Sequence, residues 1–226
     1  MNDNIKKLNM NDNIKKLCDK HYEIITSNVL APRITGELMS HRDLPTIYDI
    51  CQIVKPKNIL ELGFNRGSSA LMWLMCSDAN LLSTDMHYLP QSVDYLKSKY
   101  KDRFNFRHIN HEVIRDCDEY IEQFDLIFVD GGHQRSSIER DIKTCLKFNP
   151  KYVAFDDFYH PSHHKNHIDL VKGKYIHNFN IIKKYDRRQD RSNLGPGDDG
   201  FRGGQILTEL KSTQSPTTEI PTLGLQ

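Results

Sequence analysis

The chain has 226 residues, of which 38% are hydrophobic and 27% are charged, and its formal net charge at pH 7 is +1. This length suits one domain of ordinary size, and the composition is that of a folded chain. A net charge so close to zero excludes the strongly basic field of nucleic-acid-binding domains, so we expect no nucleic acid partner.

The sequence also lacks the marks of a membrane or secreted protein. No apolar stretch is long enough to cross a bilayer, and the N-terminus has no apolar signal-peptide core. The 5 cysteines are scattered, without the close pairs typical of zinc or redox sites. We therefore expect a cytoplasmic protein with reduced thiols and no membrane partner.

The N-terminal part contains a short duplication and two expected helices. Residues 1–8 read MNDNIKKL and recur as residues 10–17. We expect segment 1–18 to be a frayed or helical lead-in without a catalytic role. Segment 19–57 should hold the N-terminal helices, one over 19–29 and one over 46–54, with Pro45 near the first turn of the second.

From residue 58 onward, strands alternate with helices. The pattern predicts strands over 58–62, 80–84, 104–109, 124–129 and 152–155, with helices over 68–75, 92–100, 114–121 and 136–146. Such alternation is typical of a parallel sheet with helices on both faces. Two further strands, 174–183 and 205–210, have no helix between them and should pair antiparallel.

The predicted fold is therefore α/β, a Rossmann-like three-layer sandwich. Its sheet is seven-stranded and mostly parallel and ends in an antiparallel C-terminal hairpin. This domain would span 58–210, and the Ser-, Thr- and Pro-rich segment 211–226 would be a disordered tail. The Arg- and Gly-rich connection 186–204 is either a cover for an anionic substrate or a surface loop.

Two motifs follow the first two predicted strands. After the first strand the chain reads ELGFNRGSS, in which Gly63 permits a tight turn and Gly67 a close approach to a ligand. Backbone N–H groups at the start of the next helix would face that ligand. Asp85 ends the second strand at the spacing where an acid binds ribose hydroxyls in nucleotide-binding βαβ units. The alternatives are a plain turn at the glycines and an exposed aspartate at position 85. Because the glycine turn and Asp85 occur together at the expected spacing, a nucleoside site is favoured.

With these motifs, residues 58–210 resemble the class I S-adenosylmethionine-dependent methyltransferases. The resemblance rests on the 61–67 loop, Asp85, the 124–130 strand and the final hairpin. It implies that S-adenosyl-L-methionine is the cofactor, with its methionine part near the glycine loop and its ribose on Asp85. The cofactor-binding residues that it implies are Glu61, Gly63, Phe64, Asn65, Gly67, Ser68, Asp85, Met86, Asp130 and, with His111 beside the adenine, Asn110.

Three carboxylates follow the fourth and fifth strands. Asp130 ends one strand and Asp156 and Asp157 end the next, so they should converge where parallel strands end side by side. A divalent cation, most simply Mg²⁺, would relieve their repulsion and lower the pKa of a substrate hydroxyl. This pattern resembles the metal-dependent O-methyltransferases of the catechol and macrocin or sugar type. The alternative is that the aspartates only cap a helix and shape a turn.

Histidines gather near these acids. His133 is a candidate general base together with Asp130, because imidazole exchanges protons near neutral pH. The spacing of four later histidines could suit zinc on a helix, but Pro161 and polar neighbours favour a solvated helix start. The first of them is near enough to Asp157 to line the pocket. These four are His160, His163, His164 and His167.

We therefore expect a methyltransferase that modifies a hydroxyl of a small molecule or sugar with divalent-metal assistance. The alternatives are an N-methyltransferase acting on a protein or nucleic acid, a non-catalytic protein that binds a nucleotide-like ligand, and a hydroxylase-like relative with the same metal-binding edge. The sequence names no acceptor. It also leaves open whether the N-terminal helix packs against a second copy in a homo-oligomer.

Overall fold

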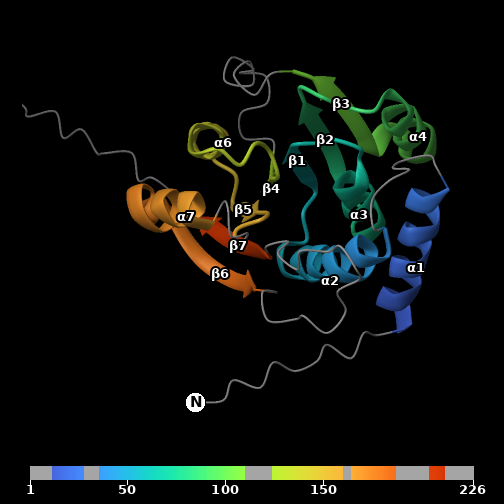
Figure 1. The fold of residues 1–226 in the computed structure, drawn as a ribbon, viewed down its shortest axis with the longest axis horizontal. Coiled ribbons are helices and arrows are strands. Elements are labelled where there is room, and N and C mark those ends of the chain that lie inside the picture. The colour runs from blue at the N-terminus through green and yellow to red at the C-terminus, as the bar shows by residue number, and fades with distance from the viewer. Residues whose placement is uncertain (1–11, 28–35, 110–123, 160–163, 187–203, 212–226) are drawn as a thin grey trace, which may run out of the picture.

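The computed structural model describes residues 12–27, 36–109, 124–159, 164–186 and 204–211. Its centre is a seven-stranded sheet in the order β3-β2-β1-β4-β5-β7-β6 (Figure 1). The first five strands pair in parallel, and β7 runs antiparallel to both β5 and β6. The predicted fold class is thus confirmed. The strands are β1 (Asn58–Leu62), β2 (Asn80–Asp85), β3 (Phe104–His108), β4 (Leu126–Val129), β5 (Tyr152–Phe155), β6 (Phe179–Tyr185) and β7 (Gln205–Leu210).

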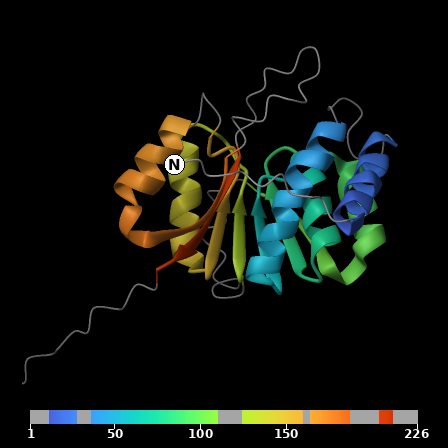
Figure 2. The ribbon, with the colours of Figure 1, turned by 90° about the horizontal axis from the view of Figure 1, so that it is seen from below.

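Helices cover both faces of the sheet, as the view along it shows (Figure 2). One face carries α1 (Asp12–Thr26), α2 (Gly36–Val54), α3 (Ser68–Cys76) and α4 (Pro90–Tyr100). The other carries α6 (Arg135–Phe148), α7 (His164–His167) and a π-helix over Ile168–Lys174. Short 3₁₀ turns, Lys101–Arg103 and Ile176–Asn178, lead into β3 and β6.

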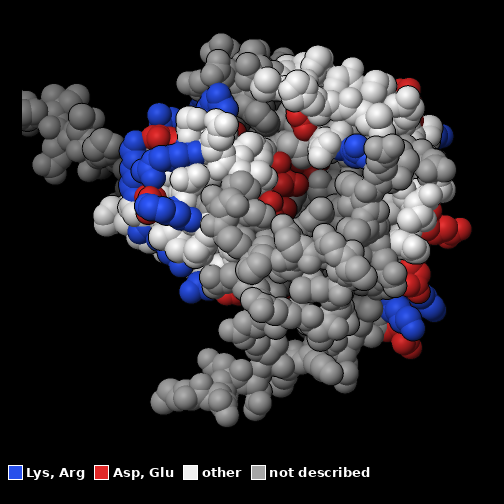
Figure 3. Space-filling model, in the orientation of Figure 1, with Lys and Arg blue, Asp and Glu red and all other residues white. Residues whose placement is uncertain are grey.

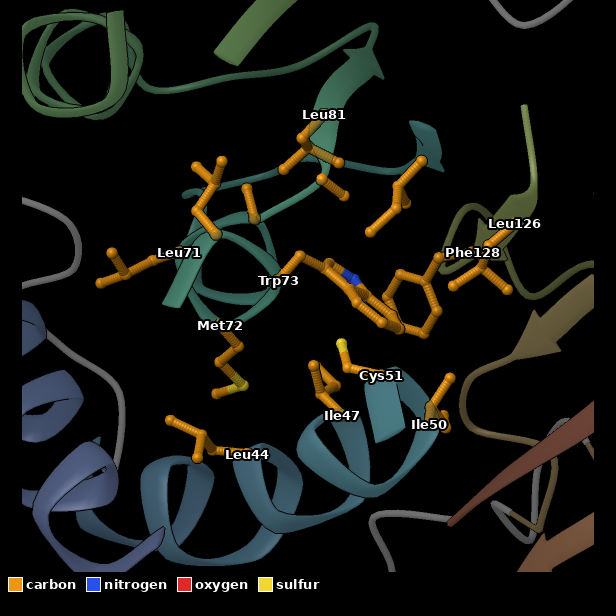
Figure 4. Close-up of a cluster of buried hydrophobic side chains, with 14 of the residues drawn as sticks. Leu44, Ile47, Ile50, Cys51, Leu71, Met72, Trp73, Leu81, Leu126 and Phe128 are labelled. Atoms are coloured by element: carbon orange, nitrogen blue, oxygen red, sulfur yellow. The ribbon is translucent and has the colours of Figure 1, made fainter. Parts of the chain in front are cut away.

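Alternating side chains of each strand form two cores, one on each face. Ile59 packs on the α3 face and Leu60 on the α6 face, as the two-residue period of a strand requires. On the α3 face Trp73 meets Phe128 edge to face, with ring centroids 5.2 Å apart. Figure 4 shows these rings above Ile47 and Cys51 of α2. The sheet is therefore buried on both faces, and its carboxyl edge is the part left for a site.

The structure corrects three predicted elements. The first helix, expected over 19–29, runs over Asp12–Thr26 and so begins inside the expected lead-in, because Cys18 of this stretch is already part of the buried core. Helix α2 begins at Gly36 and contains Pro45, whereas a shorter helix starting after the proline was expected. Proline removes one helical hydrogen bond, but burial of Leu44 and Ile47 on either side of it outweighs that loss. The sixth strand begins at Phe179, because helical turns occupy the preceding residues.

Several expectations fall outside the described residues. These are the helix over 114–121, most of the lead-in, the connection 187–203 and the tail from 212. Within the described part of the chain, no helix is both long and apolar enough to span a membrane. The cysteines described there, Cys18, Cys51, Cys76 and Cys145, are free thiols.

Candidate active site

The carboxyl ends of β1 and β4 lie directly against each other. A Cβ atom added to Gly63 would stand 2.1 Å from the carbonyl oxygen of Asp130, and the amide of Asp130 donates to the Leu62 carbonyl at 2.9 Å. The next neighbour along the sheet follows the same pattern, since the Asp156 amide donates to the Val129 carbonyl at 2.9 Å. The glycine loop and the aspartates therefore share one edge, as predicted from parallel pairing.

The turn between β1 and α3 has the shape that its glycines allow. Gly63 has a φ of 108° and Gly67 a φ of 77°, both in the region that disfavours side chains. The ring of Phe64 is buried against Phe104 and Phe106, with centroids 6.0 and 4.9 Å away. A cofactor at this loop would thus meet the backbone of Phe64, because its side chain belongs to the core.

Asp85 holds this loop in place. Its Oδ2 accepts hydrogen bonds from the amides of Phe64 (2.8 Å) and Asn65 (2.6 Å), and its Oδ1 accepts one from the His87 amide (2.9 Å). A carboxylate has about four acceptor positions, so these three bonds leave room for a ribose hydroxyl. Asp85, the residue predicted to bind the ribose, therefore also fixes the shape of the glycine loop.

Glu61 is a buried carboxylate beneath the loop. Its Oε2 accepts a hydrogen bond from the Ser83 hydroxyl at 2.6 Å, while its Oε1 has no hydrogen-bond partner among the described residues. Burial raises the pKa of Glu61 to about 7, and the hydroxyls of Ser69 and Ser83 partly offset this. A buried acceptor without a donor is costly, so Glu61 suits a ligand that brings a donor group.

A partly exposed wall follows β2 and β3. Met86 is 41% exposed, and its carbonyl lies 2.8 Å from Nε2 of His108. The ring of Tyr88 packs on Phe106 and His108, with centroids 4.6 and 5.0 Å away. This wall offers an apolar surface beside the loop that would suit a flat base. The predicted adenine neighbours Asn110 and His111 lie outside the described residues.

The aspartates form one electrostatic group. Asp130 and Asp156 are partly exposed, but the protein around them is dense enough that desolvation raises the pKa of both carboxyls, that of Asp156 to about 8. The negative charges of neighbouring carboxylates raise the pKa values of Asp130 and Asp156 further, and the charge of Asp157 acts on both. Figure 3 shows acidic side chains set into a hollow in this face of the molecule.

Asp157 also contacts the predicted base. Its φ of 48° is unusual for a residue with a side chain, and its Oδ2 lies 3.5 Å from Nε2 of His133. A carboxylate beside an imidazole stabilises the cation formed when the ring accepts a proton. His133 is partly exposed, so a substrate can reach it.

Two polar residues in this group were not anticipated. The side chain of Gln205, at the start of β7, hydrogen-bonds to Asp156 and is only 3% exposed, yet its Oε1 has no hydrogen-bond partner among the described residues. Asp43 of α2 is close enough to raise the pKa of both Asp130 and Asp156. No local pattern signals either residue, because α2 and β7 reach the edge only through tertiary packing.

The structure separates the later histidines. His167 is buried between the rings of Phe155 and Phe158, so the expected solvated helix start is wrong for this residue. Nδ1 of His164 lies 2.6 Å from the Phe158 carbonyl. His160 and His163 lie outside the described residues. Across the described ranges, no group of three or more His, Cys, Asp or Glu side chains is arranged to hold a metal ion.

Comparison with known proteins agrees with this geometry. Residues 60–158 match a family model described as a methyltransferase domain. No curated protein sequence matches the chain. The matched segment runs from β1 to the turn after β5 and so contains the glycine loop, Asp85 and all three predicted metal ligands.

Solved structures share the whole fold. A Podospora anserina methyltransferase bound to S-adenosylhomocysteine has 18% identity and a TM-score of 0.53, covering 88% of this chain and 94% of its own. The Streptomyces achromogenes O-methyltransferase TomG, bound to S-adenosylmethionine, has 13% identity and a TM-score of 0.56, covering 89% and 90%. A Bacillus cereus O-methyltransferase bound to S-adenosylhomocysteine has 14% identity and a TM-score of 0.53, covering 91% and 94%. At such identities the likeness concerns the fold.

Proposed function

We propose that this chain is a class I S-adenosylmethionine-dependent methyltransferase and that it transfers the methyl group to a hydroxyl of a small molecule or sugar. One observation carries the proposal: the glycine loop (residues 61–67) touches the acidic group formed by Asp130, Asp156 and Asp157, because Gly63 lies against the backbone of Asp130. A cofactor on the loop and an acceptor at the acids would therefore meet across this contact. O-methyltransferases among the proteins of similar fold support the choice of oxygen.

On the cofactor side, the chain supplies the loop amides, Glu61 and Asp85. The unpartnered Oε1 of Glu61 suits the ammonium group of the methionine part, and Asp85 has acceptor positions left for the ribose. S-adenosylmethionine brings a methyl group already activated by its sulfonium. The task left to these residues is to hold that methyl in line with the nucleophile and to exclude water.

On the acceptor side, the proposed base is His133 supported by Asp157. The 3.5 Å contact between them stabilises the imidazolium that results when His133 takes the hydroxyl proton. Asp130 would orient the same hydroxyl from the end of β4, and it is the alternative proton acceptor, because its raised pKa makes its carboxylate more basic. A hydroxyl that loses its proton becomes the stronger nucleophile that attack on the methyl requires.

A divalent cation would fit this group by the chemistry of its donors. Asp130, Asp156 and Asp157 supply carboxylate oxygens, which Mg²⁺ prefers, and a cation would relieve the repulsion that raises the pKa of the first two. When bound, such an ion lowers the pKa of a coordinated hydroxyl. The described side chains do not form a three-ligand set, so the cation is proposed from the chemistry of these donors alone.

The proposal is tested by separating cofactor binding, metal binding and acceptor choice. We expect S-adenosylhomocysteine to bind in calorimetry, and hydroxylated acceptors to be methylated in the presence of Mg²⁺ with loss of turnover after chelation. Absence of cofactor binding would overturn the proposal. Turnover that is insensitive to a chelator would remove the metal, and methylation confined to nitrogen acceptors would favour the alternative of an N-methyltransferase.

A further inference from the structure

Helix α1 brings a buried histidine to the start of α3. His21 is 0% exposed, and its Nε2 lies 3.1 Å from the carbonyl oxygen of Ser68 and 3.4 Å from the hydroxyl of the same residue. A carbonyl oxygen can only accept, so Nε2 carries the proton and His21 donates. The two residues are 47 positions apart in the sequence, so this bond exists only because α1 packs against α3.

The residue that His21 holds is the first of the helix that follows the cofactor loop. Ser68 comes directly after Gly67, whose left-handed conformation ends the loop. The N–H groups in the first turn of α3 lack helical partners and are those that can face a bound ligand. The next residue, Ser69, carries a hydroxyl that lowers the pKa of Glu61. A continuous set of contacts thus runs from α1 through the first turn of α3 to Glu61.

We propose that His21 is a positioning residue of the cofactor site: from α1 it fixes the first turn of α3, and through that turn the loop that binds S-adenosylmethionine. Helix α1 thereby acts on cofactor affinity although its histidine contacts the helix start rather than the ligand. This inference rests on the proposed function in one respect only, that the chain binds this cofactor.

The chemistry of the position favours a bonding role over simple packing. Cys18 and Ile25 are buried on the same face of α1, so the helix already has apolar residues with which to dock. Placing a polar ring between them costs free energy unless its nitrogen is hydrogen-bonded. Burial lowers the pKa of His21 to about 4, so the ring is a neutral donor at physiological pH. A leucine would fill the space without this cost but could not hold the Ser68 carbonyl.

Two variants at this position separate donation from packing. His21→Leu keeps most of the volume and removes the donor, whereas His21→Gln offers a side-chain N–H of similar reach. We expect S-adenosylhomocysteine to bind His21→Leu about tenfold more weakly than wild type in calorimetry, and His21→Gln within about threefold. Tyr22→Ala, at the neighbouring residue, which is 37% exposed, is the matched control and should bind as wild type does.

Each outcome has a distinct meaning. If wild type fails to bind S-adenosylhomocysteine, the cofactor assignment fails irrespective of His21. If wild type binds and His21→Leu binds equally well, the positioning role is overturned, and the same follows if Leu and Gln weaken binding equally. Because His21→Leu could fail to fold, hydrogen exchange in wild type gives a second readout. We expect S-adenosylhomocysteine to slow exchange in α1, and unchanged exchange there would overturn the role.

Discussion

Gly63 lies so close to Asp130 that no side chain fits between them: an added Cβ would stand 2.1 Å from the Asp130 carbonyl oxygen and 2.6 Å from its carbonyl carbon. The glycine also has a φ of 108°, which other residues rarely adopt. The contact joins the two halves of the candidate site, because Gly63 belongs to the glycine loop and Asp130 to the acidic group. The backbones of the two halves are therefore in direct contact.

This contact predicts the effect of Gly63→Ala. The methyl group would force the ends of β1 and β4 apart and would strain the backbone, so we expect at least a tenfold loss of S-adenosylhomocysteine affinity and a lower melting temperature. Calorimetry and thermal unfolding measure both. The control is Gly173→Ala, where the nearest atom to an added Cβ is 3.7 Å away. Equal affinities for Gly63→Ala and wild type would contradict the close approach.

The acidic group predicts a pH-dependent gain in stability for Asp156→Asn. In the folded chain the pKa of Asp156 is raised to about 8, whereas an unfolded aspartate titrates near 3.8. The unfolded chain therefore loses this proton first, and the free energy of unfolding of wild type falls as pH rises from about 4 to about 8. The variant lacks this loss, so its advantage over wild type should grow through that window.

Chemical denaturation at pH 5 and pH 8.5, followed by the fluorescence of the single tryptophan Trp73, measures this difference. Asp94→Asn, at an exposed position on α4, is the control and should show no such trend. Added Mg²⁺ should stabilise wild type more than Asp156→Asn if the acids hold a cation. A constant stability difference at all pH values would show that Asp156 does not titrate as its surroundings imply.

Gln205 is expected to support Asp156 in cation binding. Its side chain hydrogen-bonds to that carboxylate, and loss of such a partner typically weakens metal binding 10- to 100-fold. We therefore expect Gln205→Leu to remain folded but to bind Mn²⁺ at least about 10-fold more weakly than wild type in an electron paramagnetic resonance titration. Gln91→Leu, on an exposed part of α4, should match wild type. Unchanged Mn²⁺ affinity in Gln205→Leu would remove Gln205 from the site.

His21 predicts a loss of stability in mild acid. Its pKa is lowered by burial to about 4, although the charge of Asp43 opposes that effect, and in the unfolded chain it is near 6.5. As pH falls, the unfolded chain takes up the proton first. The contribution of the neutral His21 ring to the free energy of unfolding is therefore complete above about pH 6.5 and is lost toward pH 4. The total corresponds to about 3 kcal/mol. The free energy of unfolding of wild type should therefore fall relative to that of His21→Leu from pH 7 to pH 4.5, and a constant difference would contradict the buried neutral ring.

The sequence by itself determined the alternation of strands and helices and the two motifs that follow β1 and β2. These features are local: apolar periodicity, the glycines at 63 and 67, and the spacing to Asp85 are readable within short windows. Because the predicted strands pair in parallel, the aspartates are expected at the same edge as the glycine loop from the sequence alone. The start of α2 was missed, because packing of residues around Pro45 outweighs the local signal of proline.

Only the tertiary structure decided which distant residues complete the site. Asp43 comes from α2, Gln205 from β7 and His21 from α1, and none of them stands in a recognisable motif. It also decided that the ring of Phe64 belongs to the core and that Asp85 holds the loop through backbone amides. The physical reason is that such contacts depend on how helices and strands pack, which is a sum over many weak interactions across the whole chain. A sequence pattern within one segment does not indicate which distant segment it will contact in the folded chain.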